Sequence, residues 1–172
     1  KDSGIERIYS SSKGRALQTA EHTAKHLGLE VSSCDFMREI GWGSIDDESI
    51  LANGHPWKVA DIHVSEGKSL FDSDWRTNDP YCRSQVIECV ETVTRGLDAW
   101  LEELGYKREG EYYRVTGEDT EKTVAMFSHG GASSAAFSHM FNIPFPQFCG
   151  AFRIDFTSIT VVQLSNKTGE LI

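Results

Sequence analysis

The stretch at residues 122–140 (KTVAMFSHGGASSAAFSHM) constrains the fold of this chain more than any other. Residues 123–127 form a short apolar, β-prone run, as expected of a strand buried on both faces. Ser-His-Gly-Gly follows, and the small residues after it predict a tightly packed helix. His129 therefore lies where a buried strand ends and a helix begins, and in open α/β sheets ligands bind at that edge.

A histidine in this position has two interpretations. The free N–H groups of the helix N-terminus can hold an anion, and Gly130 and Gly131 let backbone approach a ligand without a Cβ in the way. Alternatively, His129 is a buried histidine satisfied by a backbone partner. His129 alone does not decide between the two.

A second strand–loop–helix unit lies near the N-terminus. Residues 5–9 are typical of a strand, three serines follow, and apolar or small residues then recur at helical spacing from Gly14 to a terminating Gly28. Arg15 falls in the first turn of this helix, where a cation opposes the helix dipole. Its presence there indicates another use, with a solvated arginine as the alternative.

Glu39 lies in a turn with apolar and glycine neighbours, the Met-Arg-Glu-Ile-Gly-Trp-Gly of residues 37–43. A carboxyl group in apolar surroundings can hold a proton for donation. The alternative is an ordinary glutamate on a surface turn.

The composition of the 172 residues excludes several classes of protein. Apolar residues make up 39% and charged residues 25%, which is typical of one soluble globular domain. The net charge is −9 and no basic run is longer than a pair, so no nucleic-acid partner is expected. No apolar run approaches the length of a membrane span, and no membrane partner is expected.

The cysteines indicate the compartment. The four cysteines form no CxxC pair, and no signal peptide is visible. We therefore expect reduced thiols in a cytoplasmic protein, with the cysteines as buried structural residues. These residues are Cys34, Cys82, Cys89 and Cys149.

The later part of the chain contains several further elements. Residues 85–104 carry one apolar face and predict a helix. Residues 105–119 are typical of a peripheral β-hairpin that turns around Glu109 and Gly110. Residues 142–150 are expected to form a Pro- and Phe-rich loop and residues 152–164 a strand, with a further strand beginning at the C-terminus.

Residues 44–83 show no clear periodicity, which is typical of a lid or a mobile segment. The aromatic residues in this segment would either close over a ligand or anchor the segment to the body of the protein. They are Trp57, Phe71, Trp75 and Tyr81. His55 and His63 are too isolated here to be metal ligands.

The arginine, the glutamate and the histidine together point to phosphate-ester chemistry. Arginine and histidine at helix starts recognise phosphate, and a protonated glutamate would serve as the acid for an alkoxide leaving group. Such a set stabilises phosphoryl transfer through positioning and charge, without a metal or cofactor. No HExxH, paired DxD or P-loop motif occurs, so no metal site is expected.

Three segments resemble the histidine phosphatase superfamily, the phosphoglycerate mutase-like proteins. IYSSSKGRALQTAEHTAKHLGLEV, MREIGWG and MFSHGGASS look like the second, third and fourth motifs of that family, and the resemblance covers nearly the whole chain. It implies an α/β/α sandwich on a mostly parallel sheet. It also implies that Arg15 is the pocket arginine, Glu39 the proton donor and His129 the second pocket histidine, with the N–H of Gly130 facing the phosphate of a small phosphate ester.

The chain departs from the family pattern at the nucleophile, which is a histidine in an Arg-His-Gly motif at the end of the first strand. None of the six histidines here follows an arginine. We therefore expect the first strand and helix to be missing. On this view residues 1–172 are a single histidine-phosphatase-like domain, incomplete at the N-terminus and with its C-terminal end in question, and residues 41–84 form a lid-like insertion within it.

Three functions fit these observations. The favoured one is a phosphomonoester hydrolase that acts through a phosphohistidine, with its nucleophile outside this chain, so that the fragment alone is inactive. A phosphoglycerate-type mutase would use the same pocket and return the phosphate to the substrate. A non-catalytic phosphate-binding or interaction protein would keep the fold without the nucleophile. The sequence leaves open which phosphate ester is used and what the oligomeric state is.

Overall fold

The computed structural model describes residues 3–43, 56–118 and 121–172. These residues contain five α-helices, five β-strands and three short 3-10 turns. Contacts between residues divide the chain into two compact units, each made of separated stretches. Unit 1 comprises Lys1–Arg38, Arg95–His129 and Thr157–Ile172, and unit 2 comprises Glu39–Thr94 and Gly130–Phe156.

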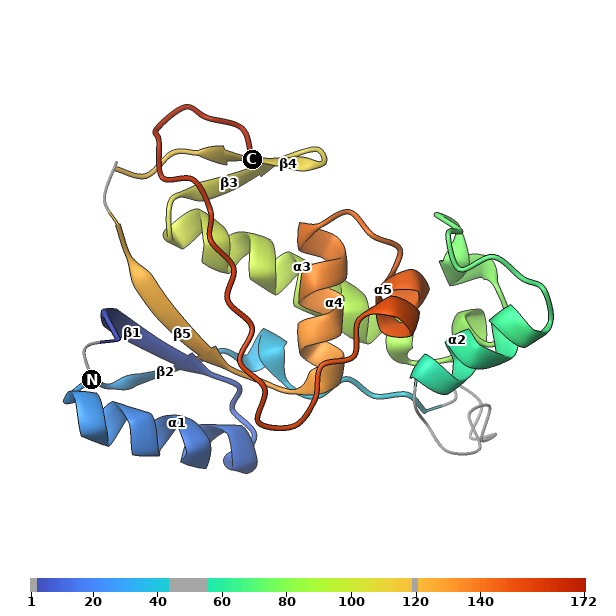
Figure 1. Ribbon diagram of the computed structural model, residues 1–172, viewed down its shortest axis with the longest axis horizontal. Helices are drawn as coiled ribbons and strands as arrows, with labels where there is room; N and C mark the ends of the chain where they lie inside the picture. The colour runs from blue at the N-terminus through green and yellow to red at the C-terminus, as the bar shows by residue number, and fades with distance from the viewer. Residues whose placement is uncertain (1–2, 44–55, 119–120) are drawn as a thin grey trace. The chain divides into compact units, whose positions relative to one another are not determined.

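Unit 1 contains a three-stranded parallel sheet. In this sheet β1 (Ile5–Ser10) lies between β2 (Val31–Ser33) and β5 (Thr123–Phe127). α1 (Gly14–Leu27) connects β1 to β2 and packs along the sheet (Figure 1). Parallel strands joined by a helix are what the repeated strand–loop–helix pattern predicts. The predicted α/β fold class on a parallel sheet is therefore confirmed.

Small side chains on α1 allow the helix to pack closely. Ala16, Ala20 and Ala24 recur every four residues and are buried, and Ala20 and Ala24 join the buried Ile8 of β1 in one apolar cluster. Gly28 follows the helix with a φ of 71°, the left-handed conformation that favours glycine, and its N–H donates to the Ala24 carbonyl. Both the helix and its glycine end agree with the prediction.

The expectation that residues 123–127 are buried on both faces is wrong. Thr123 is exposed and the other residues of β5 are half-buried. One edge of β5 pairs with β1, and within the described ranges no strand pairs with its other edge. An unpaired edge of this kind presents N–H and C=O groups to which a further strand can add.

The hairpin predicted within residues 105–119 is confirmed. β3 (Tyr106–Glu109) and β4 (Tyr112–Val115) pair antiparallel, and Gly110 in the turn has a φ of 62°. The chain end extends this pair, since the N–H of Tyr113 donates to the Ile172 carbonyl (2.8 Å) and the N–H of Ile172 donates back (2.9 Å). Leu171 forms an isolated bridge with Arg114, and no strand is assigned to the last described residues, so the expected strand is present only as this single bridge.

The predicted strand at residues 152–164 is wrong. No strand is found there, although the residues are β-prone. The side chains of Ile159 and Val161 are 90% and 84% exposed. Strand propensity measures how well side chains fit a pleated, half-buried surface, and without such a surface it does not produce a ladder.

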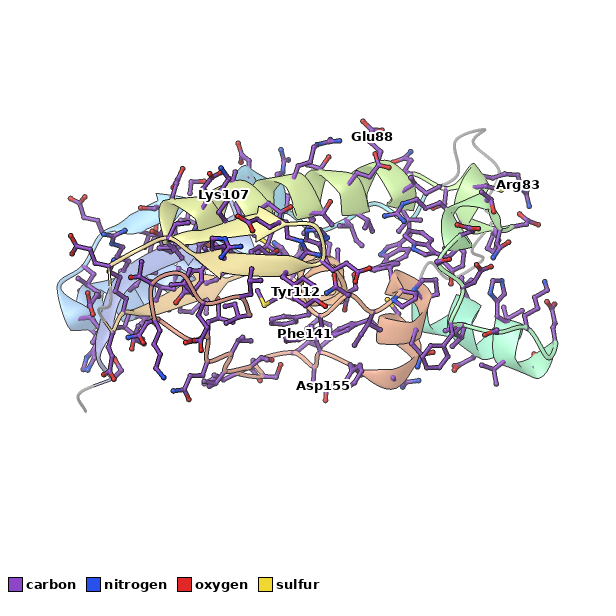
Figure 2. The ribbon with its side chains drawn as sticks, turned by 90° about the horizontal axis from the view of Figure 1, so that it is seen from above. Arg83, Glu88, Lys107, Tyr112, Phe141 and Asp155 are labelled. Atoms are coloured by element: carbon purple, nitrogen blue, oxygen red, sulfur yellow. The ribbon has the colours of Figure 1, made fainter. Side chains whose placement is uncertain are left out.

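α3 (Val86–Glu103) is the longest described helix and confirms the helix predicted at residues 85–104. Val86, Val90 and Val93 lie on its buried face, whereas Glu88 points outward (Figure 2). Residues 86–94 of the helix belong to unit 2 and the rest to unit 1. Neither α3 nor any other helix in the described residues is long and apolar enough to cross a membrane.

Unit 2 contains α2 (Pro56–Ser65), α4 (Gly130–Met140) and α5 (Phe145–Ala151). α5 packs against both α2 and α4 (Figure 1). The expected loop at residues 142–150 is therefore wrong over most of its length. The prolines that suggested a loop stand at the start of α5, where a proline is tolerated because the first N–H groups of a helix have no intrahelical partner.

The segment expected as a lid-like insertion, residues 41–84, contains regular structure where it is described. Besides α2 it includes the 3-10 turns η2 (Trp75–Thr77) and η3 (Tyr81–Arg83). Residues 44–55 lie outside the described residues. Whether the segment acts as a lid stays a prediction.

Two aromatic residues of this segment anchor it. Trp75 and Tyr81 are 3% and 2% exposed, and their rings meet edge to face with centroids 5.4 Å apart. The Trp75 ring also packs against the ring of Phe145 in α5, with centroids 5.5 Å apart. Phe71, in contrast, is 75% exposed. His55 and the side chain of Trp57 lie outside the described residues.

The cysteines are free thiols in the described structure. Cys34 and Cys149 are buried, in agreement with a structural role, whereas Cys82 is exposed. Burial, with smaller contributions from the neighbouring charges of Glu103 and Asp35, raises the pKa of the Cys34 thiol to about 11. Cys34 is therefore a poor nucleophile near neutral pH.

A glycine in α3 marks the tightest contact in unit 1. A Cβ on Gly96 would lie 2.2 Å from Cγ and 2.3 Å from Cβ of Phe36. We expect Gly96→Ala to destabilise the protein by roughly 1–3 kcal/mol through overpacking, although alanine is the better helix former. Urea unfolding measures the change. Gly14→Ala, at a position with open space around the new methyl group, is the control, and equal stability of the two variants would contradict this packing.

Candidate active site

Because β1 and β5 are parallel and end in register, the loops that follow them begin at the same edge of the sheet. Ser10 at the end of β1 lies opposite Phe127 at the end of β5. The N–H of Ser11 then donates to the Phe127 carbonyl at 2.8 Å. Because the carboxyl ends of parallel strands share an edge, the residues that follow each strand emerge side by side. His129 and Ser11 lie at this edge.

Arg15 and His129 are in direct contact within unit 1. The Nε–H of Arg15 donates to Nδ1 of His129 at 3.1 Å, and Nε2 of His129 lies 3.0 Å from Oγ of Ser11. His129 is 7% exposed and Ser11 is fully buried. A guanidinium only donates, so Nδ1 accepts, and the ring proton of His129 lies on Nε2 and points to Ser11.

This geometry suits the recognition of an anion. The contact to His129 uses Nε–H, one of the five N–H donors of a guanidinium. A planar guanidinium with several N–H donors is suited to pairing with an anion. Arg15 is exposed at the start of α1, so a ligand can reach it.

Glu39 lies in unit 2, at the N-terminus of α4. Its Oε1 accepts the N–H of Gly131 at 3.2 Å and the N–H of Ile40 at 3.3 Å. A carboxyl oxygen at this end of a helix satisfies a backbone donor that has no intrahelical partner. α4 thus fixes the carboxyl group of an otherwise exposed side chain.

Gly131 makes this contact possible. A Cβ at this position would lie 2.7 Å from Cγ1 of the buried Ile40 and 2.8 Å from Oε1 of Glu39. Only glycine therefore lets the turn at Glu39 lie against the first turn of α4. Gly130, whose N–H is predicted to face a phosphate, is the first residue of α4 and follows His129 directly.

The predicted site residues thus form two pairs of contacts. Arg15 meets His129 in unit 1, and Glu39 meets Gly131 in unit 2. Ser11 is a residue that the sequence did not single out. The only signal for it was its place among three consecutive serines, and nothing in the sequence tells which of the three reaches the histidine.

The potential metal ligands among the described residues include the histidines outside the site. Among the described residues, no group of three His, Cys, Asp or Glu side chains could hold a metal ion. His63 is 5% exposed, and its Nε2 lies 3.2 Å from the Asp79 carbonyl. It is thus a buried histidine with a backbone partner.

Replacing Ser11 by alanine tests its role as a positioning residue. The change removes the Ser11 hydroxyl that contacts Nε2 of the buried imidazole, so we expect kcat/KM of the protein encoded by the full reading frame to fall about tenfold for a phosphate ester. We also expect the ¹⁵N shifts of His129 to change, which a merely structural role would not require. Ser11→Thr should restore both, and Ser12→Ala is the control. Unchanged His129 shifts in Ser11→Ala would contradict the assignment.

Comparison with known proteins identifies the family. The family model of the histidine phosphatase superfamily (branch 1) matches residues 1–172. A solved structure titled "Mycobacterial hydrolase 1" has a similar fold, with a TM-score of 0.51 and 20% sequence identity. The similarity covers 88% of this chain but only 65% of that one. No curated protein sequence matches. With its parallel sheet and the match over its whole length, this chain belongs to the histidine phosphatase superfamily, branch 1.

Proposed function

We propose that this chain is the phosphate-binding part of a phosphomonoester hydrolase that acts through a phosphohistidine. The observation that carries the proposal is the contact between Arg15 and His129 at the carboxyl edge of the sheet. An exposed guanidinium beside a buried, doubly hydrogen-bonded imidazole is suited to holding the oxygens of a phosphoryl group. The family includes both phosphatases and mutases, so the choice of hydrolase is part of the proposal.

In the first step a histidine outside residues 1–172 attacks phosphorus. A P–N bond forms and the P–O bond to the alcohol breaks, while Arg15 stabilises the negative charge on the remaining oxygens. His129 joins it by turning the Nε2–H that contacts Ser11 in the structure to a phosphoryl oxygen. Glu39 donates a proton to the departing alkoxide, which leaves as a neutral alcohol. The products of this step are the alcohol and a phosphohistidine.

In the second step water attacks the phosphohistidine. Glu39, now a carboxylate, takes a proton from the water as the new P–O bond forms and the P–N bond breaks. Inorganic phosphate leaves, and the nucleophilic histidine and Glu39 return to their starting forms. No metal or redox partner is required for the balance of this reaction.

The proposal assigns His129 to binding and not to attack. Its Nδ1 accepts from Arg15 and its Nε2 contacts Ser11, so protein groups engage both ring nitrogens. A nucleophile needs one nitrogen with a lone pair directed at phosphorus. An additional strand at the unpaired edge of β5 would bring a nucleophile to the same carboxyl edge as Ser11 and His129.

Phosphate release from p-nitrophenyl phosphate tests the proposal. The assay compares the 172-residue chain with the protein encoded by the full reading frame. We expect turnover only in the longer protein. Activity in neither would favour a non-catalytic binding protein, and activity in the 172-residue chain would contradict an external nucleophile. With a phosphoglycerate as substrate, isomerisation without release of phosphate would identify a mutase instead.

A further inference from the structure

Unit 2 contains a hollow of about 220 Å³ that the proposed reaction does not use. It lies between the first turns of α3, the turn η2 and the connection from α4 to α5. The side chains that matter to its chemistry all belong to unit 2. They are Trp75, Arg76, Val90, His139, Asn142 and Phe145.

This hollow is separate from the contact between Glu39 and Gly131. That contact lies at the N-terminus of α4, whereas His139 lies in the last turn of the same helix. Gly131 and His139 are eight residues apart in α4, and a helix rises 1.5 Å per residue, so the two positions are roughly 12 Å apart along the helix axis. A small ligand in the hollow therefore cannot also touch Glu39.

The floor of the hollow is apolar and rigid. Trp75, Val90 and Phe145 are each no more than 3% exposed. The rings of Trp75 and Phe145 are in contact, with centroids 5.5 Å apart. Side chains packed in this way are already ordered, so they lose little side-chain entropy when a ligand binds against them.

A cation lies at the side of this floor. The guanidinium carbon of Arg76 lies 4.7 Å from the centre of the Trp75 ring. Stacking on a ring leaves the N–H donors in the plane of the guanidinium, where a carboxylate can bind two of them. The carboxylate of Glu91 lies 4.0 Å from Nε, and both side chains are close to half exposed (44% and 45%). An ion pair this long and exposed contributes little, so a ligand can replace it.

Two further polar side chains line the hollow. His139 lies in the last turn of α4, and Asn142 lies two residues after the end of that helix. Asn142 has a φ of 54°, a left-handed conformation that asparagine tolerates, and its N–H donates to the His139 carbonyl at 3.3 Å. Imidazole and amide groups thus add hydrogen-bonding capacity beside the arginine.

We propose that this hollow is an accessory binding site for a small organic anion, a carboxylate on a flat apolar body. The carboxylate would pair with Arg76, and the apolar body would lie over Trp75, Val90 and Phe145. Ligand pockets usually enclose at least about 300 Å³. The volume of about 220 Å³ therefore favours a ligand no larger than a single substituted ring.

Benzoate is the probe for this site, with neutral benzamide as its matched partner. Ligand-observed NMR titration of the protein should give a Kd for benzoate on the order of 1 mM, as expected of so small a ligand. Benzamide should bind about tenfold more weakly, because a charge-assisted hydrogen bond is lost. Arg76→Gln should weaken benzoate binding by about the same factor.

Two variants control for other modes of binding. Arg83→Gln removes an arginine that is also 44% exposed and also paired with a carboxylate, but that does not line the hollow. Arg15→Gln removes the arginine of the proposed phosphate pocket. Both should leave benzoate binding unchanged, and Arg76→Gln in the protein encoded by the full reading frame should leave phosphatase turnover unchanged. Absence of benzoate binding, equal binding of benzamide, or loss of binding in Arg15→Gln instead of Arg76→Gln would each overturn the proposal.

Discussion

Replacing Arg15 by alanine in the protein encoded by the full reading frame should lower kcat/KM for a phosphomonoester by about 10²–10⁴-fold. The change removes a charged donor from the phosphoryl oxygens. It also removes the donor to Nδ1 of His129, so the imidazole loses one of the contacts that orient it. The affinity for inorganic phosphate, measured as competitive inhibition, should fall in parallel.

Two further variants distinguish the effect of the planar guanidinium donors of Arg15 from the effect of its positive charge. Arg15→Lys keeps the charge but not the planar pair of donors, and we expect it to restore activity only in part. Lys25→Ala removes one positive charge from an exposed residue of the same helix and should leave kcat/KM unchanged. Unchanged KM and kcat in Arg15→Ala would refute the role of this residue.

Glu39→Gln should affect substrates according to their leaving group. An alkyl alkoxide needs a proton as it leaves and nitrophenolate does not, so we expect a loss of about 10²–10⁴-fold for alkyl phosphates and a small loss for p-nitrophenyl phosphate. Glutamine keeps an oxygen that can accept the Gly131 N–H, so the position of the side chain should be preserved.

The comparison across substrates is the internal control for Glu39. A structural disturbance would slow both substrates equally, and that outcome would argue that Glu39 is not the acid. Glu30→Gln, at an exposed position after α1, controls for the loss of one negative charge. It should change neither rate.

The parts of the fold that depend on local signals could be predicted from the sequence. The helix from Gly14 to its end at Gly28, the amphipathic α3 and the hairpin around Gly110 each carry their own periodicity or turn residue. The end of β5 before His129 follows from the same kind of signal. These elements also place Arg15 and His129 correctly, because each follows a strand of one parallel sheet.

The parts that depend on tertiary partners could not be predicted. Residues 152–164 have the composition of a strand, yet whether a strand forms depends on a neighbouring strand. The prolines near residues 144–146 are compatible with both a loop and the start of a helix. The residues that follow form α5, which packs against α2 and α4.

The contacts between the site residues could not be predicted from the sequence either. The sequence marks Glu39 and His129 as candidates but does not show that Glu39 accepts the Gly131 N–H, or that Ser11 contacts His129. Both contacts join residues about a hundred positions apart, and local pattern carries no information about such pairs. The functional roles of Arg15, Glu39, His129 and Gly130 stay predictions until variants are measured.

The most direct test of the proposed mechanism is to locate the phosphoryl group during turnover. The protein encoded by the full reading frame is mixed with a phosphate ester, quenched in alkali to preserve phosphohistidine, digested and analysed by mass spectrometry. We expect one phosphohistidine, in a peptide outside residues 1–172. Phosphate on His129, or turnover with no phosphorylated enzyme at any time, would contradict the mechanism.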